Sequence, residues 1–168
     1  MTLLTDALRA RIGETATYTA PEPLGRAAIR YFALAVGDAN PLYTDDAAAA
    51  EAGLDDVIAP PTLICETNQY VAGRPADAEG YLGHSWHLEV PGTRLVRGGN
   101  AYTFHRHVRP TDVVTATWRI ADMVERTTGS GQAMLSVVSE ASYANQHGDL
   151  LAENLETLVF VELKQAAS

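Results

Sequence analysis

Residues 57–73 read VIAPPTLICETNQYVAG, and this stretch decides the fold because it joins a helix start to an unusually apolar helix. Pro61 fits the first turn of a helix, where its missing N–H loses no hydrogen bond. The apolar residues after it are distributed around much of the helix circumference: Leu63, Ile64, Cys65, Val71 and Ala72. A helix that is apolar on most sides has to be covered by other structure, so we expect it to be central.

The segments that can cover this helix follow it in the sequence. From Trp86 onward the apolar period changes from 3.6 to 2. Four segments carry the β-branched and aromatic residues typical of strands, at residues 93–108, 112–126, 132–146 and 154–163. Short turn signals separate them, as at residues 128–131, which read TGSG. The pattern predicts an α+β fold in which one long helix packs on one antiparallel sheet.

The N-terminal part predicts shorter elements. We expect a helix at residues 5–13, a strand at 15–20, a helix from Leu24 that ends before Gly37, and an alanine-rich helix that ends at Gly53. The chain has 168 residues, of which 46% are apolar, so residues 1–168 are expected to form a single domain.

Charge and composition exclude several functions. The net charge of −9 argues against a general nucleic-acid binder, which needs a basic surface. No apolar run is long enough to cross a bilayer, and the N-terminus lacks a signal-peptide pattern, so we expect a soluble cytoplasmic protein. The single cysteine, Cys65, has no partner for a disulfide or a zinc site, and His84 and His87 lack companion ligands, so no metal is expected.

A local basic run interrupts the acidic background. Residues 94–109 contain no acid and four arginines: Arg94, Arg97, Arg106 and Arg109. Such a patch could receive an anionic ligand, for example the phosphates of a coenzyme. The alternative, that these arginines pair with acids on the surface of the sheet, is equally consistent with the sequence.

The loop at residues 36–45 reads VGDANPLYTD and carries the most specific candidate site. Asp38 follows the end of a helix and precedes Asn40 and Pro41. Two interpretations remain open for Asp38: a carboxylate that takes part in chemistry, or a residue that stabilises the turn by accepting backbone hydrogen bonds. Asn40 before proline is also a good turn former.

Three motifs in order, GDANPLY at 37–43, APPT at 59–62 and FHRHVRP at 104–110, resemble the MaoC-like dehydratase family, in particular its N-terminal-type MaoC dehydratase domain. The resemblance extends from about Leu24 to the last expected strand. It implies the hot-dog fold, a curled antiparallel sheet around a long central helix. It also implies action on enoyl or 3-hydroxyacyl thioesters of coenzyme A or acyl carrier protein. Coenzyme A or phosphopantetheine would be part of the substrate, and no separate cofactor is expected.

In the catalytic branch of that family the loop reads Asp-x-Asn-Pro-x-His, and the Asp and His together activate a water that adds to the enoyl double bond. Asp38 matches the Asp, whereas Tyr43 stands where the His belongs. A tyrosine, with a pKa of about 10, is a poor base near neutrality, but it can donate a hydrogen bond or act as an acid. Tyr43 is therefore a candidate catalytic residue with Asp38, and the alternative is a tyrosine packed at a dimer interface. N-terminal-type domains often pair with a second hot-dog domain that keeps the Asp/His loop. The resemblance therefore implies a heterodimer with such a subunit, with a homodimer as the alternative.

Further site residues are expected on the strand at 93–108. Family members often read His-Gly-x-Gln where this chain has Arg97, Gly98, Gly99 and Asn100. These four residues, with Asn40 and Pro61, are the predicted substrate contacts. His105 and His107 would share one face of the strand, where His105 could replace the missing acid/base group or make a structural hydrogen bond.

Two other functions are compatible with the sequence. Glu66 on the expected central helix is the candidate carboxylate of a hot-dog thioesterase, because an apolar setting raises a carboxyl pKa towards the range useful for acid/base work. The alternative interpretation is that Glu66 lies on the solvent-exposed face of that helix and has no catalytic role. The third possibility is a non-catalytic domain that binds acyl thioesters, and the fold alone does not choose among the three.

Overall fold

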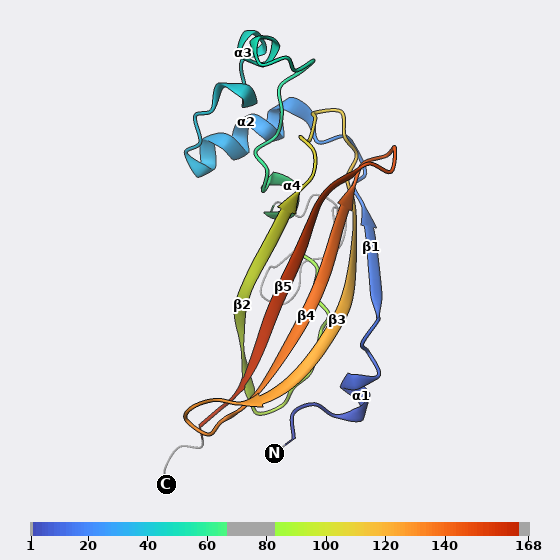
Figure 1. Cartoon of the computed structure of the whole chain (residues 1–168), viewed down its shortest axis with the longest axis vertical. Coiled ribbons are helices and arrows are strands. Elements are labelled where there is room, and N and C mark those ends of the chain that lie inside the picture. The colour runs from blue at the N-terminus through green and yellow to red at the C-terminus, as the bar shows by residue number, and fades with distance from the viewer. Residues whose placement is uncertain (1, 67–82, 165–168) are drawn as a thin grey trace.

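The computed structural model describes residues 2–66 and 83–164 of the chain. Its centre is one five-stranded sheet in the order β1-β3-β4-β5-β2, in which every neighbouring pair is antiparallel. Figure 1 shows the long strands running side by side, with α1 near one end of the sheet and α2 and α3 beyond the other. The expected α+β arrangement with an antiparallel sheet is confirmed.

The strands occupy most of the positions that the period-2 segments predicted. Their bounds are β1 Thr15–Thr19, β2 Thr93–Phe104, β3 Thr115–Thr127, β4 Ala133–Ala144 and β5 Leu150–Glu162. Tight turns join the last three, closed by hydrogen bonds from Gly131 N–H to Thr128 C=O and from Gly148 N–H to Asn145 C=O. Both glycines have positive φ, which their missing Cβ permits.

The helices are α1 Asp6–Arg9, α2 Gly25–Val36, α3 Asp46–Glu51 and α4 Leu63–Glu66, with a 3₁₀ turn, η1, at Pro41–Tyr43. The side chain of Thr5 caps α1 by accepting from Leu8 N–H, and Asp45 caps α3 in the same way. Helix α2 buries Ile29 and Ala33 and exposes most of its remaining apolar side chains.

The expected central helix begins as predicted but is described only in its first turn. Helix α4 starts two residues after Pro61, and Leu63, Ile64 and Cys65 are all buried. The remainder of the predicted helix, from residue 67 to 73, lies outside the described residues. The side chain of Glu66, the thioesterase candidate, also lies outside them.

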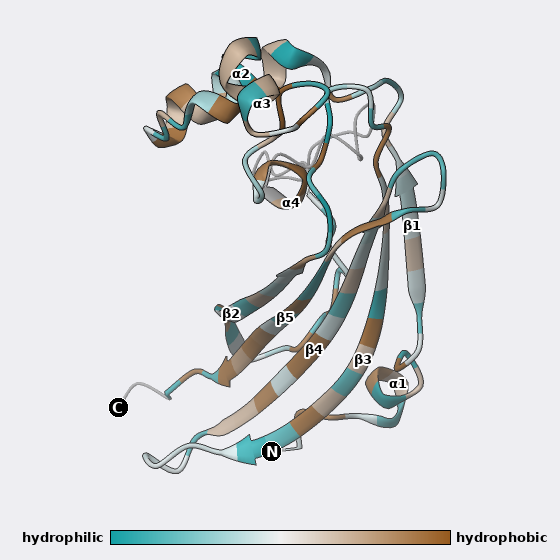
Figure 2. Ribbon diagram, turned by 45° about the horizontal axis from the view of Figure 1, so that its top comes forward, coloured by the Kyte–Doolittle hydropathy of each residue, from teal (hydrophilic) through white to brown (hydrophobic). Residues whose placement is uncertain are grey.

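The main core lies on one face of the sheet, which we call the inner face. On β4 this face carries Leu135, Val137, Ala141 and Tyr143, all buried at alternate positions. Trp86 packs on the same face and donates its indole N–H to Ser139 Oγ at 2.9 Å. Figure 2 shows the resulting alternation of hydrophobic and hydrophilic residues along β3, β4 and β5.

One prediction about the strands was wrong. The segment at residues 93–108 leaves the sheet after Phe104, so His105 and His107 do not sit on a strand. The N–H groups of His105 and Arg106 both point to Leu151 C=O, which ends the regular ladder. Val108 C=O then accepts from Ala59 N–H at 2.8 Å, so the chain pairs with the loop before α4 instead.

No helix within the described residues is long and apolar enough to cross a membrane. The cytoplasmic location and the single domain over residues 1–168 stay predictions.

Candidate functional site

The loop that follows α2 holds Asp38 in a fixed position. Gly37 ends the helix in the left-handed conformation with φ of 71°, as is usual for a glycine at this place. Asp38 then donates its backbone N–H to Ala33 C=O at 2.9 Å, which closes the last turn. The side chain of Asp38 is exposed, so its carboxylate can reach molecules in solution.

Asn40 organises the turn on both sides. Its backbone N–H donates to Asp38 Oδ1 at 3.1 Å, and its own side-chain Oδ1 accepts from Leu42 N–H at 3.1 Å. The second bond caps η1, where Pro41 occupies the first turn. These are the backbone contacts expected of a turn-forming Asp-x-Asn-Pro sequence, and a contact of Asn40 with substrate stays a prediction.

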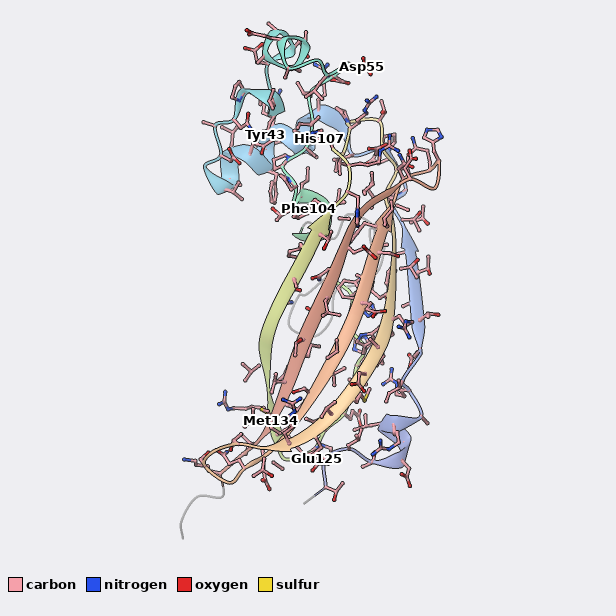
Figure 3. The ribbon with its side chains drawn as sticks, viewed as in Figure 1. Tyr43, Asp55, Phe104, His107, Glu125 and Met134 are labelled. Atoms are coloured by element: carbon pink, nitrogen blue, oxygen red, sulfur yellow. The ribbon has the colours of Figure 1, made fainter. Side chains whose placement is uncertain are left out.

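Tyr43 ends η1 and is buried, with 7% of its surface exposed. Burial raises the pKa of the Tyr43 hydroxyl above its ordinary value of 10, and the negative charge of Asp38 raises it further. A hydrogen bond with the side chain of Asn40 lowers it in part. The loop thus brings Asp38, Asn40 and Tyr43 together, and Figure 3 shows Tyr43 among the helices beyond the end of the sheet.

This arrangement has clear chemical limits. A phenol whose pKa is raised above 10 stays protonated near neutrality, so Tyr43 can donate a hydrogen bond but cannot remove a proton from water. Asp38 is then the one carboxylate of the three residues. Of the Asp/His pair that the family resemblance implies, the loop contains the Asp and lacks the His, and a catalytic role of Asp38 stays a prediction.

His105 and Pro61 meet elsewhere, in a pocket of about 210 Å³ between the loop before α4 and the end of β2, lined also by Phe104, Arg106 and His107. His105 Nε2 lies 2.8 Å from Glu153 Oε2 on the neighbouring strand β5, so the structural hydrogen bond that the sequence left open is present. A role of His105 in proton transfer stays a prediction, and so does a contact of Pro61 with substrate.

The third group of predicted residues lies on the edge strand β2. Gly98 and Gly99 form an irregularity in the pairing with β5, where the register shifts between Arg97 and Gly99. A Cβ on Gly98 would lie 3.0 Å from Thr157 O, and Gly99 has φ of 149°, so both positions require glycine for the bulge itself. Contacts of either glycine with substrate are untested.

The two polar residues beside these glycines, Arg97 and Asn100, have partners on β5. Arg97 Nη1 lies 3.9 Å from Glu156 Oε1, and Asn100 Oδ1 accepts from Asn154 Nδ2 at 2.9 Å. Arg106 pairs with Asp149, and Arg109 pairs with Asp55 at 3.4 Å. Three of the four arginines in the basic run therefore form ion pairs, as one of the two interpretations of the run expected. A contact of these arginines with coenzyme phosphates stays a prediction.

Asn154 and Glu156 were not among the predicted site residues. Both faces of β5 carry large apolar side chains, such as Leu155 and Val159 on one and Leu158 and Phe160 on the other. Alternation alone could not show which face is inner, because that depends on the pairing with β4. Among residues 2–65 and 83–164, no group of three or more His, Cys, Asp or Glu is placed to hold a metal ion.

Comparison with known proteins gives relatives over most of the chain. A family described as FAS1-like, dehydratase domain region, matches residues 10–154. The UPF0336 protein of Thermobifida fusca is 39% identical over 134 residues, which is 77% of this chain and 81% of that protein. The UPF0336 protein SCO4636 of Streptomyces coelicolor is 41% identical over 106 residues, 63% of this chain and 66% of that protein.

A relative with a named activity is the 3-oxo-4,17-pregnadiene-20-carboxyl-CoA hydratase alpha subunit of Mycobacterium tuberculosis. It is 30% identical over 141 residues, which is 76% of this chain and 40% of that subunit. The present chain thus matches less than half of the length of that relative.

Solved structures share the fold. The ChsH1-ChsH2 complex of M. tuberculosis superposes with a TM-score of 0.68 at 25% identity, over 92% of this chain and 87% of that one. The HadBC (3R-hydroxyacyl-ACP dehydratase) complex of the same organism gives 0.61 at 26% identity, over 86% and 95%. The MaoC-like dehydratase of Rhodospirillum rubrum, at 17% identity over 92% and 94%, gives 0.63 and supports the fold alone.

The expected hot-dog fold is therefore confirmed. The chain belongs to the family of the FAS1-like dehydratase domain region, and it shares its fold with the MaoC-like dehydratase of R. rubrum.

Proposed function

We propose that this chain is the histidine-lacking subunit of a two-subunit hydratase/dehydratase that acts on enoyl and 3-hydroxyacyl thioesters of coenzyme A or acyl carrier protein. The observation that carries the proposal is the buried Tyr43 beside Asp38. The loop retains its shape and its carboxylate, yet the position that needs a base holds a phenol whose pKa is raised.

Hydration of an enoyl thioester needs one group to take a proton from water and one to deliver a proton to the α-carbon, both within a small volume. With its pKa raised, Tyr43 cannot act as the base and is a weaker proton donor than an ordinary tyrosine, so this loop offers Asp38 and only a poor acid in place of the histidine. A second hot-dog subunit with an intact Asp-x-Asn-Pro-x-His loop would supply both groups. In the complex, the present chain would shape the acyl-binding space and the partner would perform the chemistry.

The relatives support a paired arrangement. Two of the solved structures that share the fold are complexes, ChsH1-ChsH2 and HadBC, and the hydratase relative is named an alpha subunit. The ligands and assemblies of those proteins are properties of those proteins and are not observed for this chain. For this chain, a pair in which β2 lies at the interface is consistent with the position of that strand at the edge of the sheet.

The test is reconstitution with a second hot-dog chain that carries the intact loop, sought among the neighbouring reading frames. The two chains are co-expressed and purified as a complex, and hydration of a short enoyl-CoA is followed by the loss of the enoyl thioester absorbance. We expect the complex to be active. Asp38→Asn in this chain should lower kcat by less than about tenfold, whereas the same change in the partner's loop abolishes it.

Three outcomes would reject the proposal. Loss of all activity on Asp38→Asn in a folded complex would place the chemistry in this chain. Release of free thiol from acyl-CoA without hydration would indicate the thioesterase instead. Binding of coenzyme A thioesters without turnover, even in the complex, would favour the non-catalytic binding domain.

A further inference from the structure

Four polar side chains lie together on the largely apolar inner face of the sheet. Ser139 on β4 pairs in register with Glu156 on β5, and Glu156 pairs with Asn100 on β2. Asn154 lies diagonally next to Asn100 and bonds to it. We call Asn100, Ser139, Asn154 and Glu156 the inner polar cluster. Its neighbours on β4 and β5 on this face are hydrophobic, and Arg97 lies beside it on β2: Val137, Ala141, Tyr143, Leu158 and Phe160 are the hydrophobic ones.

The cluster runs from the surface into the core. Asn100 is exposed on the edge strand, Glu156 has 13% of its side chain exposed, and Asn154 is 4% exposed. Ser139 is fully buried, and its hydroxyl accepts from the indole N–H of Trp86. The hydrogen bond from Asn154 Nδ2 to Asn100 Oδ1 is therefore a link between a buried amide and a solvent-facing one.

Asn154 is only half satisfied. Its Nδ2 has Asn100 as partner, but no donor among the described residues forms a hydrogen bond with its buried Oδ1. Buried amide oxygens in folded proteins are nearly always hydrogen-bonded, because an unmet acceptor in a low-dielectric interior is unfavourable. Asp112, another buried polar side chain, accepts from Arg109 N–H and from Asn145 Nδ2. The unmet acceptor thus distinguishes Asn154.

We propose that the inner polar cluster is a binding site for a hydrogen-bonding group, an amide or a hydroxyl, of the thioester ligand, with Asn154 as the residue that recognises it. This proposal rests on the proposed function. An amide or a hydroxyl supplies both a donor for Asn154 Oδ1 and an acceptor for Asn154 Nδ2. A saturated hydrocarbon chain supplies neither, so an alkyl group gains nothing at this position.

Asn100 is the group that such a ligand displaces. Its side-chain oxygen already accepts the hydrogen bond that Asn154 Nδ2 donates. Because Asn100 is exposed, its side chain can rotate into water, where its amide is hydrated. The exchange replaces one neutral hydrogen bond with two. Arg97, 63% exposed and 3.9 Å from Glu156, places a positive charge at the same edge, where it favours a ligand that carries an anionic group such as a phosphate.

Thioester ligands carry the required group in two places. The pantetheine arm contains amides and a hydroxyl, and an oxygenated acyl chain contains a hydroxyl. The experiment separates the two sources. Dissociation constants are measured by titration calorimetry for coenzyme A, octanoyl-CoA and 3-hydroxyoctanoyl-CoA, with the full chain and with the reconstituted two-subunit complex.

The variants are Asn154→Leu, which keeps the volume and removes both hydrogen-bonding atoms, and Asn100→Ala, which removes the competing side chain. We expect Asn154→Leu to weaken binding by about fivefold or more. We expect Asn100→Ala to tighten it, because the ligand no longer has to displace that side chain. The control is Ser142→Ala on the opposite face of β4, which should change nothing. Thermal melting of each variant checks the fold. If Asn154→Leu does not fold, the ligand affinity of Asn100→Ala alone tests the proposal.

The proposal predicts that the two substitutions change the ligand affinity in opposite directions. If the Asn100–Asn154 pair were only structural, both substitutions would change the affinity in the same direction. An Asn154→Leu effect already present with coenzyme A assigns the site to the pantetheine arm. An effect confined to the hydroxylated thioester assigns it to the acyl chain. Wild-type affinity for all three ligands in Asn154→Leu, or unchanged or weaker binding in Asn100→Ala, overturns the proposal. If the complex still hydrates enoyl-CoA, this inference fails alone. If the wild-type complex neither binds nor hydrates, the proposed function fails with it.

Discussion

Asn40 donates its backbone N–H to Asp38 Oδ1 at 3.1 Å, so the carboxylate of Asp38 is tied to the turn that also carries Tyr43. The turn therefore fixes an exposed carboxylate, while Tyr43 occupies the position at which the proposed function would need a histidine. A loop that had lost its function altogether would not need to keep the exposed carboxylate, since an asparagine accepts the same backbone bond.

The side chain of Asn40 should stabilise this turn measurably. Replacing it with alanine removes the acceptor of the Leu42 N–H, which caps η1, and we expect Asn40→Ala to lower the free energy of unfolding by about 1 kcal/mol. Urea denaturation measures the change. Asp38→Asn keeps a side-chain oxygen for Asn40 N–H and serves as the matched control. Equal losses in the two variants would show that the cap contributes nothing specific.

Tyr43 should make the protein sensitive to alkaline pH. Its folded pKa is raised above the unfolded value near 10, so its contribution to stability is fully present below pH 10 and is lost as the pH rises through the folded pKa. We expect the melting temperature of the wild type to fall more steeply above pH 10 than that of Tyr43→Phe. Parallel pH profiles for the two proteins would contradict the burial of the hydroxyl beside Asp38.

Glu125 should have the opposite pH dependence at the other end of the sheet. It accepts backbone N–H groups from Leu3 and Leu4 at 3.1 and 3.0 Å, and these bonds lower its pKa. Its contribution is therefore present above the unfolded pKa near 4.5 and is lost as the pH falls through the lower folded value. Figure 3 shows Glu125 at this end of the molecule.

Amide hydrogen exchange at Leu3 and Leu4 provides the measurement for Glu125. Protection should be lost as the pH falls through the lowered folded pKa of Glu125, and Glu125→Gln should show the weaker protection already at neutral pH. The control is Glu140→Gln, which removes a surface partner of Arg119 on β3 and leaves the N-terminal residues untouched. Unchanged protection in Glu125→Gln would mean that packing alone holds this segment.

Gly98 should not tolerate a side chain. A Cβ there would meet Thr157 O and Val159 Cγ2 at 3.0 Å, so Gly98→Ala is expected to destabilise the protein by about 1–3 kcal/mol. Gly129→Ala is the matched control, since a Cβ at that turn meets nothing within 4 Å. If the two alanine variants unfold at the same denaturant concentration, Gly98 is not held by the bulge, and its place in the motif needs a ligand to explain it.

The sheet could be predicted from the sequence because its signal is local. Residues such as Leu135 and Val137 alternate with smaller or polar ones, and that period identifies a strand without knowledge of its neighbours. The end of β2 could not be predicted in this way. His105 to Val108 continue the alternation, yet the backbone turns to bond Ala59, a contact that depends on a segment more than 40 residues earlier.

In the candidate site, too, the local features could be predicted from the sequence and the long-range contacts could not. Asp38, Asn40 and Tyr43 could be predicted because they lie within six residues of one another, so the turn itself brings them together. The burial of Tyr43 depends on tertiary packing, and the meeting of Asn100 with Asn154 depends on the register between β2 and β5. Strand register is fixed by contacts along the whole strand, so a single motif does not reveal it.

The most direct test of the account is the hydration of a short enoyl-CoA by the purified chain alone, at protein concentrations equal to the substrate, beside its Asp38→Asn variant. The account predicts that neither protein hydrates the substrate, although both are folded, and that the wild type becomes active when the partner subunit is added. Hydration by the chain alone that disappears in Asp38→Asn would contradict it. Asp38 would then act without a histidine in its loop, and Tyr43 or His105 would share the proton transfer.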